Sequence, residues 1–139
     1  MDDIYGRLHA DHQELLSLFE QIIERGQKDD TSFSRAKDLF TAHKDAEEDT
    51  FYDLLEQDEQ LRPMIMQARM EHHAANTLFR ETDWLTFNDE KWMAKVKVLH
   101  EMISHHVEKE EGELFEMSRS VIAESQAVEL GERFERKAA

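Results

Sequence analysis

The sequence predicts an all-α protein, an up-down-up-down antiparallel four-helix bundle with a short C-terminal fifth helix. Three observations support this prediction. Apolar residues recur every three or four positions through four long segments, and no segment alternates apolar and polar residues as a strand would. Glycine and proline are scarce, at 4 and 1 of 139 residues. The long segments are joined by short polar stretches, which is typical of antiparallel neighbours in a bundle.

Residues that cap or break helices delimit the elements. We expect helices at about residues 2–25, 32–57, 63–84, 89–119 and 124–137. Gly26 can end the first helix, and Pro63 suits the first turn of the third. A break at 86–89 separates the third helix from the fourth, with Asn88 as a candidate N-cap. Residues 1–139 are expected to form a single domain, with the fifth helix either covering one side of the bundle or presenting a surface to a partner.

Composition restricts the classes of function. The chain is 40% hydrophobic and 35% charged, and it has no apolar run near the ~20 residues of a membrane-spanning helix. Its polar, acidic start does not resemble a secretory signal, so we expect a cytoplasmic protein without a membrane partner. The net charge of −15 disfavours nucleic acid as a partner, because such a surface repels phosphates. The absence of cysteine excludes disulfides and thiolate sites, whereas eight histidines suggest metal or proton chemistry.

Polar residues interrupt the apolar stripes at regular positions. In the first helix Ile4, Leu8, Leu15 and Phe19 form a stripe whose missing member is His12. The other three long helices have similar gaps. The six stripe-breaking residues are His12, His43, Glu47, His72, His106 and Glu110. They occupy positions where the 3.6-residue period requires core residues.

A sequence repeat contains four of these residues. The stretch HKDAEEDTFY at 43–52 returns as HVEKEEGELF at 106–115, and Asp11-His12 has a fainter echo in Glu71-His72. A histidine and a glutamate four residues apart lie on one face of a helix. The repeat therefore predicts two ligand pairs that face each other, related by a pseudo-twofold axis.

The predicted chemistry follows from the cost of burying these groups. A buried carboxylate without a partner costs several kcal/mol, and no Lys or Arg lies in the stripes nearby, so we expect a cation. Four imidazoles and two carboxylates are too many ligands for one four-coordinate zinc and too rich in nitrogen for calcium or magnesium. The set suits iron or manganese, with zinc or copper able to compete. The pseudo-twofold axis favours two metal ions.

The ordered pattern H, HxxxE, H, HxxxE resembles the hemerythrin-like, or HHE cation-binding, family. Here it reads His12, His43 with Glu47, His72, and His106 with Glu110, and the resemblance covers about residues 3–119. The whole ordered set is specific, although one HxxxE pair alone is a weak signal. The resemblance implies a non-haem di-iron centre, with two iron ions bridged by an oxo or hydroxo group. Manganese or zinc could substitute for the iron.

The chain departs from the oxygen-carrying members of that family. Those have five histidines, with HxxxH on the third helix and HxxxxD on the fourth. Here Asn76 and Thr77 follow His72 and His73 by four residues, and the fourth helix carries HxxxE. One fewer imidazole argues against reversible O2 storage and for a more open, more reactive iron. Tyr5 and Tyr52 are near the ligands in sequence, and packing is the favoured interpretation of both, with a phenolate ligand as the alternative.

Other residues near the site have two interpretations each. We expect His9, His73, His100 and His105 at the surface, with His73 replacing His72 if the third helix is rotated by one residue. Four carboxylates adjoin the ligands, namely Asp11, Glu48, Glu71 and Glu111. They point about 100° away on a helix, so we expect most of them to be solvated. The alternative is a hydrogen bond to a ligand imidazole.

Three functions remain open at this point. The first is a di-iron protein that binds or senses a small ligand such as O2 or NO, or takes part in iron or oxidative-stress handling. The second is a di-iron oxidoreductase that acts on peroxide or NO. The third is a bundle with a purely structural cation. The sequence leaves open whether the protein is an enzyme and which protein partner it has.

Overall fold

The computed structural model describes residues 2–84 and 88–139, and within these ranges every regular element is a helix. The prediction of an all-α protein is confirmed. The elements are α1 (Ile4–Arg25), α2 (Asp30–Glu47), η1 (Glu48–Tyr52), α3 (Asp53–Leu55), α4 (Arg62–Trp84), α5 (Asp89–Lys109), η2 (Glu110–Leu114), α6 (Phe115–Ser118) and α7 (Glu124–Ala138). None of the helices in the described residues is long and apolar enough to cross a membrane.

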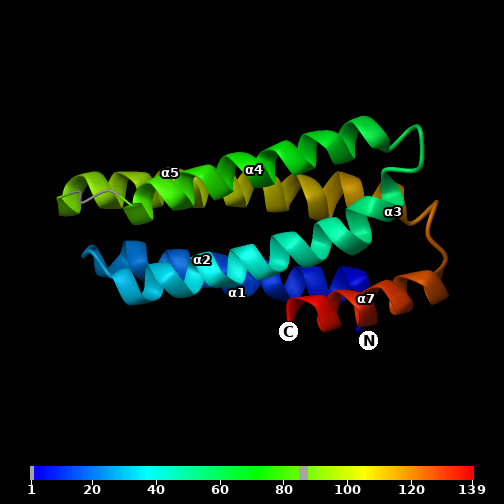
Figure 1. The fold of residues 1–139 in the computed structure, drawn as a ribbon, viewed down its shortest axis with the longest axis horizontal. Helices are drawn as coiled ribbons and strands as arrows, with labels where there is room; N and C mark the ends of the chain where they lie inside the picture. The colour runs from blue at the N-terminus through cyan, green and yellow to red at the C-terminus, as the bar shows by residue number, and fades with distance from the viewer. Residues whose placement is uncertain (1, 85–87) are drawn as a thin grey trace.

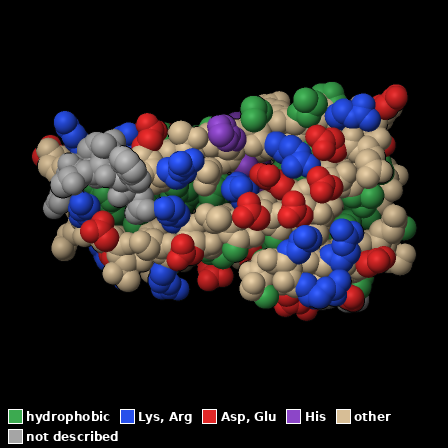
Figure 2. All heavy atoms as spheres, in the orientation of Figure 1, with side chains coloured by type: hydrophobic (Ala, Val, Ile, Leu, Met, Phe, Trp, Pro, Cys, Tyr) green, Lys and Arg blue, Asp and Glu red, His purple; other side chains and the backbone are tan. Residues whose placement is uncertain are grey.

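The long helices α1, α2, α4 and α5 lie side by side (Figure 1). In that view α1 and α2 form the lower layer, and α4 and α5 form the upper one. The segment α2–η1–α3 continues as one rod, as does α5–η2–α6. Acidic and basic side chains are interspersed over the face seen in Figure 2, which keeps the charged groups in water around an apolar interior.

Capping side chains explain where the long helices begin and end. Asp3, Asp29 and Asn88 are the N-caps of α1, α2 and α5, and the side chain of each accepts a hydrogen bond from a backbone N–H of the first turn. Asp29 starts α2 two residues earlier than expected. Gly26 ends α1 in the left-handed conformation, with φ 70°, as predicted. The predicted break at 86–89 lies partly outside the described residues, and its described end is the cap at Asn88.

Two π-helical turns, η1 and η2, follow the two HxxxE pairs directly. A π turn adds one residue to a helical turn, so it shifts the register of all residues that follow. The apolar period predicts Leu54 and Met117 in the core. Instead Leu55 and Ser118 are buried, Leu54 is half-buried, and Met117 is exposed. The expected register was therefore wrong beyond each π turn.

Two apolar clusters lie on either side of the stripe-breaking residues. One surrounds Phe51 and Phe115 and includes residues of α1, α4 and α7. The other surrounds Phe19, Phe79 and Trp92 at the opposite end of the long helices. The six polar residues therefore form a layer between two dry cores, where an unpartnered charge is costly.

The C-terminal helix α7 packs against α1, α2 and η1. Its buried residues are Ala127, Leu130, Gly131 and Phe134. A Cβ atom at residue 131 would lie 2.7 Å from the backbone oxygen of Asp2, so glycine permits this close approach. Helix α7 therefore covers one side of the bundle, the first of the two roles considered for it.

Candidate metal centre

The six stripe-breaking residues meet in one buried layer. α1 contributes His12, α2 contributes His43 and Glu47, and α4 contributes His72. α5 and the first residue of η2 contribute the last two, His106 and Glu110. All six side chains are buried, with exposed fractions from 0% for Glu47 to 8% for His106.

The inward nitrogen of each histidine faces a carboxylate. Glu47 Oε1 lies 3.3 Å from Nε2 of both His43 and His72. Glu110 faces the other two histidines. Its Oε1 lies 3.3 Å from His12 Nε2, and its Oε2 lies 3.5 Å from His106 Nε2. Each glutamate therefore joins histidines from both halves of the chain.

Two groups of donor atoms have the spacing of cation sites. His12, His43 and Glu47 form one group, and Glu47, His72 and His106 form the other, with the donor atoms of each group within 4.8 Å of one another. The imidazole rings pair in the same way, with centroids 4.9 Å apart for His12 and His43 and 4.6 Å apart for His72 and His106. Glu47 belongs to both groups.

The outward nitrogen of every one of these histidines lies against a carboxylate. His12 Nδ1 is 2.6 Å from Glu111, and His43 Nδ1 is 2.9 Å from Asp11. The remaining two contacts join His72 Nδ1 to Glu48 at 2.8 Å and His106 Nδ1 to Glu71 at 2.6 Å. The expectation that most of these four carboxylates are solvated was therefore wrong. A signal was present, because each carboxylate adjoins a candidate ligand and recurs in the second half of the chain.

These outer contacts determine how the imidazoles are oriented. A carboxylate at Nδ1 favours the tautomer with its proton there, which leaves Nε2 free to bind a cation. The contacts also obey the predicted pseudo-twofold relation, since Asp11 corresponds to Glu71 in the repeat and Glu48 corresponds to Glu111. The two halves of the chain therefore build the two halves of the centre in the same way.

The centre has buried polar atoms without hydrogen-bond partners. Among the described residues they are His12 Nε2, both carboxylate oxygens of Glu47, and Glu110 Oε1. Buried polar atoms are nearly always satisfied in folded proteins, because leaving one unpaired costs about 1–3 kcal/mol. The unpaired atoms face the middle of the layer, and imidazole nitrogens with carboxylate oxygens suit iron, manganese or zinc. The residues present therefore fit a metal centre.

The neighbouring carboxylates shift the pKa values of the histidines that they contact. Burial lowers the pKa of His43, but the charge of Glu47 and the contact with Asp11 outweigh it and raise the pKa to about 10. His106 behaves likewise, because Glu110 and Glu71 overcome burial and raise its pKa to about 10. Burial alone would raise the pKa of Glu110, yet its contacts with His106 and His12 hold this pKa well below the usual value.

Tyr52 also belongs to the site. Its hydroxyl donates a hydrogen bond to Glu110 and lies 3.3 Å from His106 Nε2, and its ring stacks on His72 with centroids 5.2 Å apart. In an α-helix Tyr52 would point about 140° away from Glu47, and the π turn of η1 removes that difference. Burial, followed by the charges of Glu110 and Glu47, raises the pKa of its phenol.

The remaining candidates lie outside the layer. Tyr5 makes its hydrogen bond to Ser118, at 2.7 Å. His72 rather than His73 faces inward, since His73 is exposed, and His105 is exposed as well. His9 is exposed and contacts Glu111, and His100 is half-buried near Glu20.

A family model described as the hemerythrin HHE cation-binding domain matches residues 3–118. No curated protein and no solved structure matches the chain. The matched range contains all six residues of the buried layer and ends before α7.

Proposed function

The chain belongs to the hemerythrin HHE cation-binding family, and on that premise we propose that it is a di-iron protein that binds or senses a small ligand such as O2 or NO. The observation that carries the proposal is the set of buried atoms on His12, Glu47 and Glu110 that make no hydrogen bond, although His12 Nε2 lies 3.3 Å from Glu110 Oε1. Two donor groups that share Glu47 support two metal ions rather than one. We further infer an up-down-up-down antiparallel bundle, which the short connections between the long helices support.

In this proposal each metal position takes two imidazoles. His12 and His43 would hold one ion, His72 and His106 the other, with Glu47 and Glu110 shared between them. Iron bound there would supply a redox-active Lewis acid with open positions for a diatomic ligand or peroxide. The chain's own part is to orient the imidazoles through their outer carboxylates and to keep water out with the two apolar clusters.

A second candidate function is a di-iron oxidoreductase that acts on peroxide or NO. The observation that favours it is the Tyr52 hydroxyl, which holds a proton beside Glu110 and His106. Such a group can donate a proton to a bound substrate. Tyr52→Phe should then keep the metal but lose most of the peroxide consumption of the iron-loaded protein. If the variant consumes peroxide as fast as the unmodified protein, the tyrosine has no such role.

The decisive experiment is metal analysis with an absorption spectrum, on protein produced with iron and purified without chelator. Close to two irons per chain, with ligand-to-iron bands in the near ultraviolet, is the expected result. A stable O2 or NO adduct without turnover would then favour binding or sensing, and repeated peroxide consumption would favour the oxidoreductase. Zinc alone, or a single metal after iron supplementation, would contradict both and leave a structural cation.

A further inference from the structure

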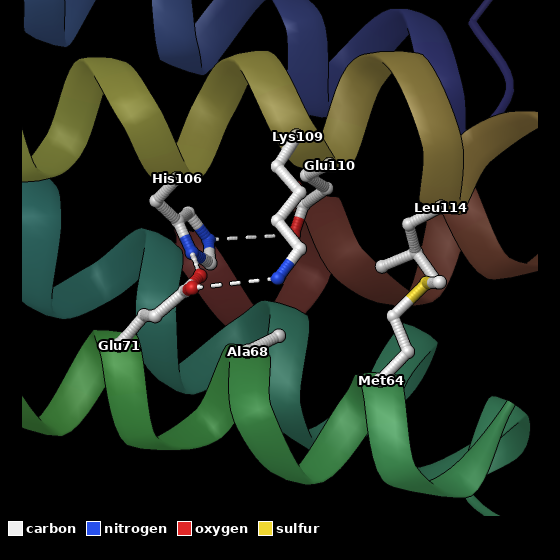
Figure 3. Close-up of a pocket in the computed structure, with 7 residues that line it drawn as sticks. All are labelled: Met64, Ala68, Glu71, His106, Lys109, Glu110 and Leu114. Atoms are coloured by element: carbon white, nitrogen blue, oxygen red, sulfur yellow. Dashed lines mark hydrogen bonds and ion pairs between the residues drawn. The ribbon is translucent and has the colours of Figure 1, made fainter.

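We propose that small ligands enter the centre from the α4 side, through a window between α4 and the α5–η2 rod whose width is set by Ala68. This inference rests on the proposed function and assigns the specificity for small ligands to one residue. Figure 3 shows the window, with Glu71, Ala68 and Met64 along α4 and His106, Lys109, Glu110 and Leu114 along the opposite rod.

The window leads directly to two residues of the centre. His106 and Glu110 line it, and Ala68 and Leu114 line it beside them. His106 is the most exposed of the six residues of the layer, at 8%, and the other five are at 0–4%. The cavity volume is about 10 Å³, close to the room that one water molecule needs. A diatomic molecule or peroxide is only slightly larger than water, whereas a thiol or other organic molecule is much larger.

Flexible side chains cover the window. Lys109 extends across it to Glu71, with 3.9 Å between Nζ and Oε2, and both side chains are about a quarter exposed. An ion pair at such a surface is weak, so it can open at little cost. Met64 is half-buried at the other end of the window, and its unbranched side chain adapts easily.

The pseudo-twofold relation allows the two sides of the centre to be compared. On the α1 side, larger side chains fill the position that Ala68 occupies on the α4 side. The offset that relates His12 to His72 relates Leu8 to Ala68 and Ile4 to Met64, and both Leu8 and Ile4 are fully buried. Helix α7 also covers that side, with the Phe134 ring 5.6 Å from the His43 ring. The two halves share their ligands but differ in what covers them, and the short side chain of Ala68 leaves the α4 side open.

The test measures nitric oxide binding to the iron-loaded, reduced protein by stopped-flow absorption. Ala68→Leu introduces the side chain that Leu8 has at the equivalent position. This variant should lower the association and dissociation rate constants together, by about tenfold or more. The equilibrium dissociation constant and the iron content should stay unchanged, because a narrower entrance slows both directions equally. Ala74→Leu adds the same side chain at an exposed position of α4 and is the matched control. Ala68→Val narrows the window less and should lower both rate constants by a smaller factor.

The outcomes separate this inference from the proposed function. If nitric oxide binds the unmodified protein and Ala68→Leu leaves both rate constants unchanged, the window is wrong and the proposed function stands. If the iron-loaded unmodified protein forms no adduct, the proposed function fails and the inference fails with it. If Ala68→Leu does not fold, Ala68→Val decides, because unchanged rate constants in that variant overturn the proposal.

Discussion

The two glutamates of each Glu-Glu pair in the repeat have different roles. Glu47 and Glu110 are buried and face the centre, whereas Glu48 and Glu111 are 22–23% exposed and contact the outer nitrogens of His72 and His12. Adjacent residues on a helix point about 100° apart, so consecutive glutamates can reach both sides of the imidazole layer. A buried carboxylate can bridge cations, and a partly exposed one orients a ligand at lower desolvation cost.

The outer carboxylates should contribute measurably to metal binding. Glu111→Gln weakens the contact that orients His12, so we expect the metal affinity to fall by about 10- to 100-fold, with full stoichiometry at saturating metal. Competition with a chelator of known affinity measures this change. Glu113→Gln, an exposed position in the same π turn, is the matched control. Equal affinities in the two variants would mean that the outer contact is incidental.

Metal binding should release protons. His43 and His106 have a pKa of about 10 in the metal-free site, so both imidazoles carry an extra proton at pH 7. A cation at Nε2 requires the neutral ring, so the bound form holds fewer protons and the affinity rises as the pH rises toward 10. Calorimetric titration at pH 7 in buffers of different ionisation enthalpy measures the protons released. A binding enthalpy independent of the buffer would contradict this prediction.

At the scale of elements, the π turns connect the ligand pairs to the rest of the fold. The turn η1 begins one residue after Glu47, and the turn η2 begins at Glu110. In η1 the added residue brings Tyr52 into the centre. In η2 the repeat has Phe115 at the equivalent position, which packs against Tyr5 and Phe51. The same backbone feature therefore gives the two halves of the centre different surroundings.

Two helical glycines should respond in opposite ways to the same substitution. A Cβ at Gly112 in η2 would meet nothing within 4 Å, so Gly112→Ala should raise the free energy of unfolding by about 0.4–1 kcal/mol. A Cβ at Gly131 in α7 would lie 2.7 Å from the Asp2 oxygen, so Gly131→Ala should lower it by about 1–3 kcal/mol. Chemical denaturation measures both. Similar effects at the two positions would mean that α7 does not approach the start of the chain so closely.

At the scale of the whole molecule, the layer of six polar residues divides the interior into two apolar clusters. Histidine–carboxylate contacts join helices of the bundle across this layer. A cation that binds only the folded chain stabilises it by mass action, in addition to satisfying the unpaired atoms. Stability and metal content should therefore be linked.

Metal binding should raise the melting temperature of the protein. We expect a clear increase when iron or zinc is added to metal-free protein, measured by scanning calorimetry. Glu47→Ala removes the carboxylate shared by both donor groups and should abolish most of that increase. His105→Ala changes an exposed neighbour of the layer and should retain it. If His105→Ala lost the increase and His106→Ala kept it, the orientation of α5 would be wrong.

The sequence by itself determined the helical class and the six residues of the layer. Both depend on periodicity within single helices, because a histidine at a core position of a stripe is turned inward whichever helix it meets. The cap positions at Gly26 and Asn88 are local in the same way. The repeat, which is also visible in the sequence alone, predicted the pseudo-twofold relation that the outer hydrogen bonds follow.

Only the tertiary structure decided which groups act between elements. The outer carboxylates reach histidines on other helices, so their partners depend on packing rather than on spacing along the chain. The place of Tyr52 depends on a π turn, which the 3.6-residue period does not reveal. The side that α7 covers was equally hidden, because its apolar face fits any neighbour of similar character until close contacts such as that of Gly131 select one.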